Sequence, residues 1–176
     1  MTDPLRELKI RAALLQRRIA DRQPSALARL HVLPEFRTHD QLVQTETRVL
    51  RRHCLAVLAR ELGFPTWTHL KDVISGARDV SDFGTLLYPT RCGGHLNLWY
   101  SRYDEAVIGR RACGGYLLAY RRHFMVVQSS FIETLGLDPN ASEWQRLGRD
   151  WVRPHDMHAR TRLYGQLIAQ MPREVP

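Results

Sequence analysis

The chain has 176 residues, of which 44% are hydrophobic, and its 26 Lys and Arg against 18 Asp and Glu give a formal net charge of +8. This length and composition predict a globular protein made of one domain or two small ones. No apolar run approaches the roughly 20 residues of a membrane-spanning helix, and the start of the chain lacks the basic and then apolar order of a signal peptide. We therefore expect a cytoplasmic protein with no membrane association.

Apolar side chains recur at steps of three and four from Leu5 to Ile19, which indicates an amphipathic helix at the start of the chain. Pro24 can begin a second, short helix, because proline is tolerated in a first turn. We expect that helix to continue through Leu33, where Pro34 prevents its extension.

A further helix is predicted before residue 63. Thr38 and Gln41 have the spacing of a capping box that would begin one segment. Thr45 or Thr47 is expected to cap a helix that runs to Leu62. The N-terminal third of the chain is therefore predicted to be entirely helical.

The segment from residue 63 to residue 74 is predicted to contain a tight turn between two helices. Gly63 can adopt the left-handed conformation that ends a helix, which lets Phe64 fold back onto the last turn in a Schellman motif. Thr66 can then cap the next helix. We expect Phe64 to be buried, and a tryptophan to insert between the two helices. The predicted apolar face of the second helix consists of Trp67, Leu70 and Ile74.

This pattern resembles a helical module of bacterial proteins that carries a Gly-Phe-x-x-Trp motif, often precedes ankyrin repeats and also occurs in the bacterial domain labelled glyoxalase-related. The resemblance covers about residues 5–74. It implies a helical module and no particular reaction. No ankyrin-type repeat follows residue 75 in this sequence. The residues that match the module are Ala56, Ala59, Gly63, Phe64, Trp67, Leu70 and Lys71, with a weaker upstream match at Leu30, Pro34 and Phe36.

The residues from 75 to 81 are small and polar, as in a linker, and a second unit is predicted after them. Its first strand spans residues 95–100 and is predicted to be half-buried. The alternation places Leu96, Leu98 and Tyr100 on one face and His95, Asn97 and Trp99 on the other. Ser101 and Asp104 have the spacing of a capping box for a helix that ends near residue 113.

Two strands, 116–120 and 124–128, follow that helix and are predicted to form a hairpin, because they are rich in aromatic and branched residues. Ser130 and Glu133 are expected to form the capping box of another helix, and residues 138–140 a turn. A last helix is predicted from about Asp156 to Ala169.

The predicted fold class is therefore α+β. A helical Gly-Phe-x-x-Trp module spans residues 1–75, and a strand, helix, hairpin and helix with a C-terminal helix span residues 82–176. The hairpin and the first strand are expected to form a small antiparallel sheet. The sequence leaves open whether the two parts pack as one domain.

Familiar catalytic motifs are missing from the sequence. The Gly pairs at 93–94 and 114–115 lack the further residues of a dinucleotide or phosphate-binding loop, so we interpret them as turns. There is no Gly-x-Ser-x-Gly, His-Glu-x-x-His or paired Cys-x-x-Cys motif. Three cysteines at unrelated spacings argue against a disulfide framework. These observations indicate a protein that is not an enzyme and has no resident cofactor.

Zinc is the one cofactor for which the residues offer candidates. Cys92 and His95 are spaced like half of a zinc knuckle, and His155 and His158 are a second pair three residues apart. Cys92 could also act as a nucleophile, with His95 or His123 as its base. The alternative is that residues 92–95 form a turn and that the histidines lie at a helix start.

A nucleic-acid interface is suggested by arginines that alternate with aromatic residues. The alternative is that the tyrosines lie in the core and that the arginines are a solvated sheet edge. No helix-turn-helix or ribonucleoprotein motif is present. The candidate residues are Arg110, Arg111, Arg121, Arg122 and His123, next to Tyr103, Tyr116 and Tyr120.

Our main hypothesis from the sequence is a non-enzymatic binding or interaction module whose ligand is a protein, self-association to a homodimer included. The alternative is nucleic-acid binding without sequence specificity. A metal-binding or cysteine-dependent enzyme is a third possibility.

Overall fold

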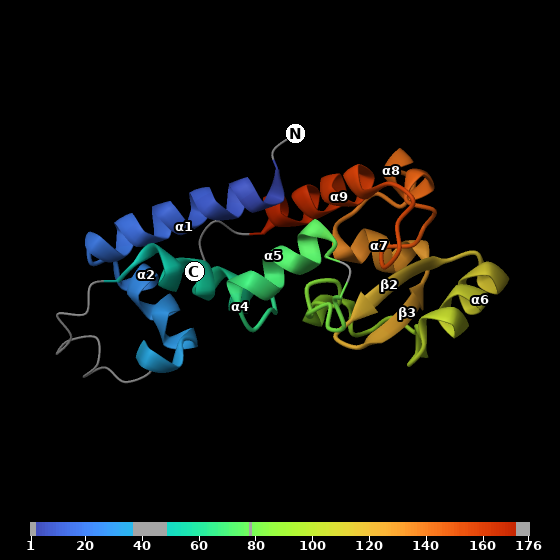
Figure 1. Cartoon of the computed structure of the whole chain (residues 1–176), viewed down its shortest axis with the longest axis horizontal. Helices are drawn as coiled ribbons and strands as arrows, with labels where there is room; N and C mark the ends of the chain where they lie inside the picture. The colour runs from blue at the N-terminus through green and yellow to red at the C-terminus, as the bar shows by residue number, and fades with distance from the viewer. Residues whose placement is uncertain (1–2, 37–48, 78, 172–176) are drawn as a thin grey trace.

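The computed structural model describes residues 3–36, 49–77 and 79–171, and its fold is α+β, as predicted. The helices α1, α2, α4 and α5 form one half of the molecule, and a three-stranded antiparallel sheet with α6, α7 and α8 forms the other (Figure 1). The C-terminal helix α9 extends back from the second half and contacts α1 and α5. None of the helices in these ranges is long and apolar enough to cross a membrane.

Helix α1 (Pro4–Ala20) confirms the amphipathic prediction, because Leu8, Ala12, Leu15 and Ile19 are all buried. Its start is fixed by Asp3, whose carboxylate accepts a hydrogen bond of 2.8 Å from a backbone N–H of the first turn.

The second helix is shorter than predicted. α2 (Pro24–Ala28) gives way to 3₁₀ turns at Arg29–Val32 and Pro34–Phe36. The residue before Pro34 is extended, as steric conflict with the proline ring requires.

Helix α4 (Arg51–Glu61) begins after Leu50, whose N–H donates to Nδ1 of His53 over 3.2 Å. The expected capping residues Thr38, Gln41, Thr45 and Thr47 lie outside the described residues.

The turn between α4 and α5 (Trp67–Ser75) has the predicted geometry. Gly63 has φ +82°, and the N–H of Phe64 donates to the carbonyl of Ala59 over 2.9 Å, as in a Schellman motif. Thr66 caps α5 by accepting from a backbone N–H over 3.1 Å. Phe64 is the deeply buried aromatic residue, whereas Trp67 is half-buried at the margin of the core. The expected insertion of Trp67 between the helices is therefore only partial. Leu70 and Ile74 are fully buried, as predicted.

The sheet has the order β1-β3-β2. β2 (Tyr116–Tyr120) and β3 (His123–Val127) confirm the predicted hairpin, and Arg121 in its turn has φ +52°. β1 (Leu98–Tyr100) is shorter than predicted and lies at the edge of the sheet. The prediction of a half-buried strand is wrong, because Leu96 is 100% exposed, Leu98 is 49% exposed and Trp99, on the other face, is 44% exposed. Only β3 flanks this strand, so little of it is covered.

Neither predicted capping box of the second half is formed. Helix α6 (Tyr103–Cys113) follows Arg102, and Ser101 does not cap it. The carboxylate of Asp104 instead binds the guanidinium of Arg102 over 2.7 Å. Helix α7 (Ser129–Leu135) already includes Ser130, which therefore cannot serve as its N-cap.

The end of the chain follows the predictions more closely. Asp138 accepts from the N–H of Asn140 over 2.8 Å and forms the predicted turn. A short helix α8 (Ser142–Arg146), which was not predicted, comes next. Helix α9 (Met157–Gln170) then begins at the predicted Asp156, whose carboxylate accepts from two backbone N–H groups.

Two clusters of hydrophobic side chains form the interior. One lies within the helical half, around α1, α2 and α4. The larger cluster includes Leu70 and Val73 of α5 together with Phe131, Trp144 and Leu163 from the second half. The segments on either side of residues 75–81 therefore share buried contacts.

We predict that Gly63→Ala lowers the free energy of unfolding by more than about 1 kcal/mol, because its left-handed φ strains any other residue. A Cβ atom at this position would also lie 1.8 Å from Oγ1 of Thr85. Gly94→Ala is the matched control, since a Cβ there has nothing within 4 Å. Urea denaturation of both variants checks this, and equal losses would contradict the role given to Gly63.

Candidate functional site

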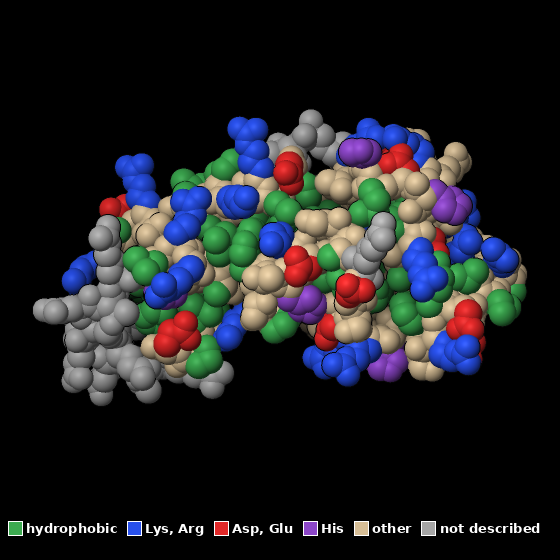
Figure 2. Space-filling model, in the orientation of Figure 1, with side chains coloured by type: hydrophobic (Ala, Val, Ile, Leu, Met, Phe, Trp, Pro, Cys, Tyr) green, Lys and Arg blue, Asp and Glu red, His purple; other side chains and the backbone are tan. Residues whose placement is uncertain are grey.

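The arginines proposed for nucleic acid lie at two ends of one structural unit. Arg121, Arg122 and His123 are exposed at the hairpin turn, where α6 also begins. Arg110 and Arg111 lie in the last turn of α6, near the opposite end of the hairpin. Figure 2 shows Lys and Arg side chains spread over both halves of the visible face, with no single continuous patch. The two groups of arginines therefore lie at opposite ends of α6 and the hairpin.

The metal candidates do not form a cluster within the described part of the chain. Cys92 lies buried in a 3₁₀ turn (Thr90–Cys92), and the ring of His95 bonds to the hydroxyl of Thr134 over 2.9 Å. His155 lies beside Gly148, and His158 lies exposed in the first turn of α9. Within residues 3–36, 49–77 and 79–171, no three His, Cys, Asp or Glu side chains form a group that could hold a metal ion.

Burial raises the pKa of the Cys92 thiol, and Arg91 only partly opposes this effect. An activated cysteine nucleophile needs the opposite shift, because the thiolate is the reactive form. The surroundings of Cys92 are those of a structural cysteine.

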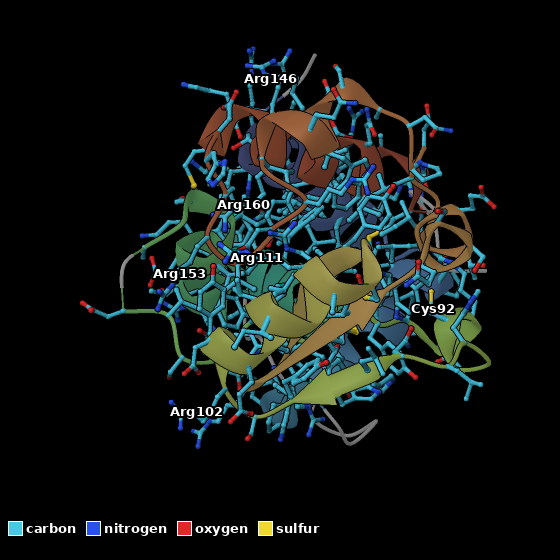
Figure 3. All side chains as sticks on the ribbon, turned by 90° about the vertical axis from the view of Figure 1, so that its right-hand side faces the viewer. Cys92, Arg102, Arg111, Arg146, Arg153 and Arg160 are labelled. Carbon is cyan, nitrogen blue, oxygen red and sulfur yellow. The ribbon has the colours of Figure 1, made fainter. Side chains whose placement is uncertain are left out.

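The arginines that do come together line a cavity between the two halves. Its volume is about 590 Å³, and its walls come from the end of α5, residues 80–83, the start of α6, the hairpin and residues 152–160. Arg153 and Arg160 lie on the same side of the molecule in Figure 3, opposite Cys92. The polar side chains that line the cavity are those of Ser81, Ser101, Tyr103, Arg122, Arg153 and Arg160.

Arg160 is the unusual member of this group, because its side chain is only 3% exposed. Nη1 donates to the carbonyl of Trp151 over 3.1 Å, and Nη2 donates to the carbonyl of Val73 over 3.4 Å. The buried Nε has no hydrogen-bond partner. Among the described residues no carboxylate forms an ion pair with Arg160. Its guanidinium also lies 5.8 Å from the centre of the Tyr164 ring. A buried charge without a carboxylate partner is costly, and here two carbonyls and an aromatic ring offset part of that cost.

Arg153 is held at the cavity by a second set of contacts. Its guanidinium lies 4.1 Å from the centre of the Tyr103 ring, a cation–π contact. The Tyr103 hydroxyl donates to the buried carboxylate of Asp150 over 2.5 Å. The other oxygen of Asp150 accepts from the backbone N–H groups of Val152 and Arg153 over 3.0 and 2.9 Å. Asp150 thus holds both the Tyr103 ring, on which the Arg153 guanidinium lies, and the backbone of Arg153 itself.

The backbone around Asp150 is fixed in turn by strand β2. Leu117 donates its N–H to the carbonyl of Arg149 and accepts from the N–H of Trp151, each over 2.9 Å. Burial and the hydrogen bond to Asp150 raise the pKa of Tyr103 well above its ordinary value. Tyr103 therefore stays neutral and acts as a donor at physiological pH.

The chemistry that this arrangement supports is binding. Three arginines line a cavity whose described lining includes no Asp, Glu, His or Cys side chain. The lining does contain the hydroxyls of Ser81, Ser101 and Tyr103, but none of its described side chains is a carboxylate or an imidazole that could activate them, whereas donors for a phosphate or a carboxylate are abundant.

Sequence reasoning identified Arg122 and Tyr103 but missed Arg153 and Arg160. One signal for Arg160 was present, because it lies three residues before Leu163 on the buried face of α9. An arginine among apolar residues at helical spacing indicates a buried cation. Nothing in the sequence around residue 153 indicates that its side chain reaches the same cavity.

Comparison of this chain with protein-family models, with curated proteins and with solved structures gave no match. The resemblance of residues 5–74 to the Gly-Phe-x-x-Trp module therefore stays a prediction.

We predict that Tyr103→Phe lowers the free energy of unfolding by about 1 to 3 kcal/mol, because it leaves an oxygen of the buried Asp150 without its donor. Tyr120→Phe is the control, since Tyr120 makes ring contacts that phenylalanine retains. Denaturant melts of both variants measure the difference. Equal stabilities of the two variants would contradict a structural role for the Tyr103 hydroxyl.

The raised pKa of Tyr103 also predicts a pH dependence. In the unfolded chain Tyr103 loses its proton near the ordinary value of about 10, whereas in the folded chain it keeps the proton to higher pH. The stabilisation is therefore fully present below pH of about 10 and is lost as the pH rises further. Unfolding curves above this pH should show a shallower decline for Tyr103→Phe than for the unaltered chain.

Proposed function

We propose that this protein is a binding module whose ligand places a phosphate or a carboxylate group in the arginine-lined cavity. The observation that supports this most strongly is the buried guanidinium of Arg160, which lines the cavity without a carboxylate partner among the described residues. An anion in the cavity would supply the missing countercharge.

Arg122 and Arg153 suit the same role in a different way. Both side chains are exposed and line the cavity from opposite elements, the hairpin turn and the loop before α9. Arginine presents a planar fork of donors that binds phosphate or carboxylate oxygens in pairs. The three arginines could therefore approach one anionic group from separate directions.

This proposal makes the sequence-based hypothesis of an interaction module more specific, because it names the kind of chemical group that is bound. A protein ligand remains compatible with it, if the protein offers an acidic or phosphorylated group, and we propose a cytoplasmic location as before. A long nucleic-acid track is less well supported, because such binding needs several phosphate contacts along one surface. Arg110 and Arg111 lie at the other end of α6 from Arg122.

We predict that inorganic phosphate raises the melting temperature of the protein at constant ionic strength, because it binds the folded state only. The double variant Arg122→Gln with Arg153→Gln should lose most of this response. Arg111→Gln is the matched control, because this arginine is exposed but does not line the cavity. Equal loss of response in the double variant and in the control would indicate general screening of charge and would overturn the proposal.

A further inference from the structure

The walls of the cavity away from the arginines are apolar. They come from three parts of the chain that the fold brings together: the end of α5 with residue 80, the hairpin with the segment before it, and the loop that leads into α9. The apolar side chains that line them are Val73, Ala77, Val80, Phe83, Phe124, Val152, Pro154 and Met157. A volume of about 590 Å³ is within the usual range for small-molecule sites.

Aromatic rings form the part of this wall nearest to the arginines. The rings of Phe83 and Phe124 lie 6.2 Å apart, and those of Tyr103 and Phe124 lie 5.7 Å apart, both edge to face. Arg153 covers the Tyr103 ring, so the charged and the aromatic surfaces of the cavity are continuous. A ligand held by Arg153 would therefore touch aromatic carbon directly beside its anionic group.

Few hydrogen-bonding side chains remain for the rest of such a ligand. Apart from the arginines, the lining offers the hydroxyls of Ser81, Ser101 and Tyr103, and the last of these already donates to Asp150. A ligand body rich in polar groups would leave many of them unpaired inside the cavity, which costs affinity. An apolar body instead gains by leaving water.

We infer that the cavity takes a small organic anion in which one phosphate or carboxylate group is attached to an apolar body about the size of an aromatic ring. This inference rests on the proposed function and adds the chemical class of the ligand. It follows from the combination of a buried guanidinium, which has no carboxylate partner among the described residues, with an apolar wall beside it. The ligand would also bridge the two halves, since Val73 and Ala77 belong to one and Arg122 and Phe124 to the other.

Calorimetric titration of the full chain with simple probes tests the class. Phenyl phosphate is expected to bind at least tenfold more tightly than inorganic phosphate, or benzoate at least tenfold more tightly than acetate. If the gain in affinity from the phenyl ring is larger for the phosphates, the natural ligand carries a phosphate; if it is larger for the carboxylates, the ligand carries a carboxylate. Adenosine monophosphate, which joins a phosphate to a polar body, is expected to gain less than phenyl phosphate.

Two variants separate the apolar body from the anionic group. Met157→Gln changes a lining side chain that is 36% exposed, so the core is little affected. It should lower the affinity for phenyl phosphate by a larger factor than the affinity for inorganic phosphate. Ile108→Gln is the control, because this side chain is 67% exposed and lies on α6 away from the lining. It should change neither affinity.

The outcomes distinguish failure of this inference from failure of the proposed function. Equal binding of phenyl phosphate and inorganic phosphate, together with equal binding of benzoate and acetate, would overturn the apolar body; loss of all four on replacing Arg122 and Arg153 would leave the anion site intact. Tighter binding of adenosine monophosphate than of phenyl phosphate would overturn it in favour of a nucleotide. No binding of any anion would overturn both proposals.

Discussion

The buried guanidinium of Arg160 links the two halves of the molecule, which also share a large hydrophobic cluster. From α9 it donates to the carbonyl of Trp151 beside β2 and to the carbonyl of Val73 near the end of α5. Carbonyls in the last turn of a helix lack partners within the helix and carry partial negative charge, so a cation there is stabilising. Gly76 makes the approach possible, because a Cβ atom at that position would lie 2.5 Å from Nη2 of Arg160. The contact therefore needs an arginine on one helix and a glycine at the end of another.

The cavity is a consequence of the same arrangement. Two backbone carbonyls hold the side chain of Arg160 at the wall of the cavity. The other segments that line the cavity are held by separate hydrogen bonds. Phe83 donates its N–H to the carbonyl of Arg121, and Arg121 donates to the carbonyl of Gly84, so the segment after the linker is bonded to the hairpin turn. These hydrogen bonds bring Phe83 and Arg122 into the lining of the same cavity. Because each wall is held by its own backbone hydrogen bonds, the site is largely formed before any ligand binds, which lowers the entropic cost of binding.

Local signals predicted the elements well where nothing nearby competed with them. Gly63, Thr66 and Asp156 each act within a few residues, and the structure confirms the turn at Gly63, the cap at Thr66 and the start of the last helix near Asp156. The capping box at Ser101 failed because the carboxylate of Asp104 binds Arg102 instead. The prediction that β1 is half-buried was wrong for a different reason. Alternation identifies which side chains share a face, but whether that face is covered depends on the neighbours of the strand, and β1 is at an edge.

The sequence by itself determined the α+β class, the main helices and the hairpin, because each depends on periodicity, caps and turns within a short stretch of chain. Only the tertiary structure determined which charged side chains lie close to one another. It separated Arg110 and Arg111 from Arg121 and Arg122 along α6, and it placed Cys92 and His155 in different surroundings. It also brought Arg153 and Arg160 to the same cavity as Arg122. Arg122 is tens of positions from Arg153 and Arg160 in the chain. Their proximity follows from how the helices and the sheet pack, and no pattern of neighbouring residues specifies that packing.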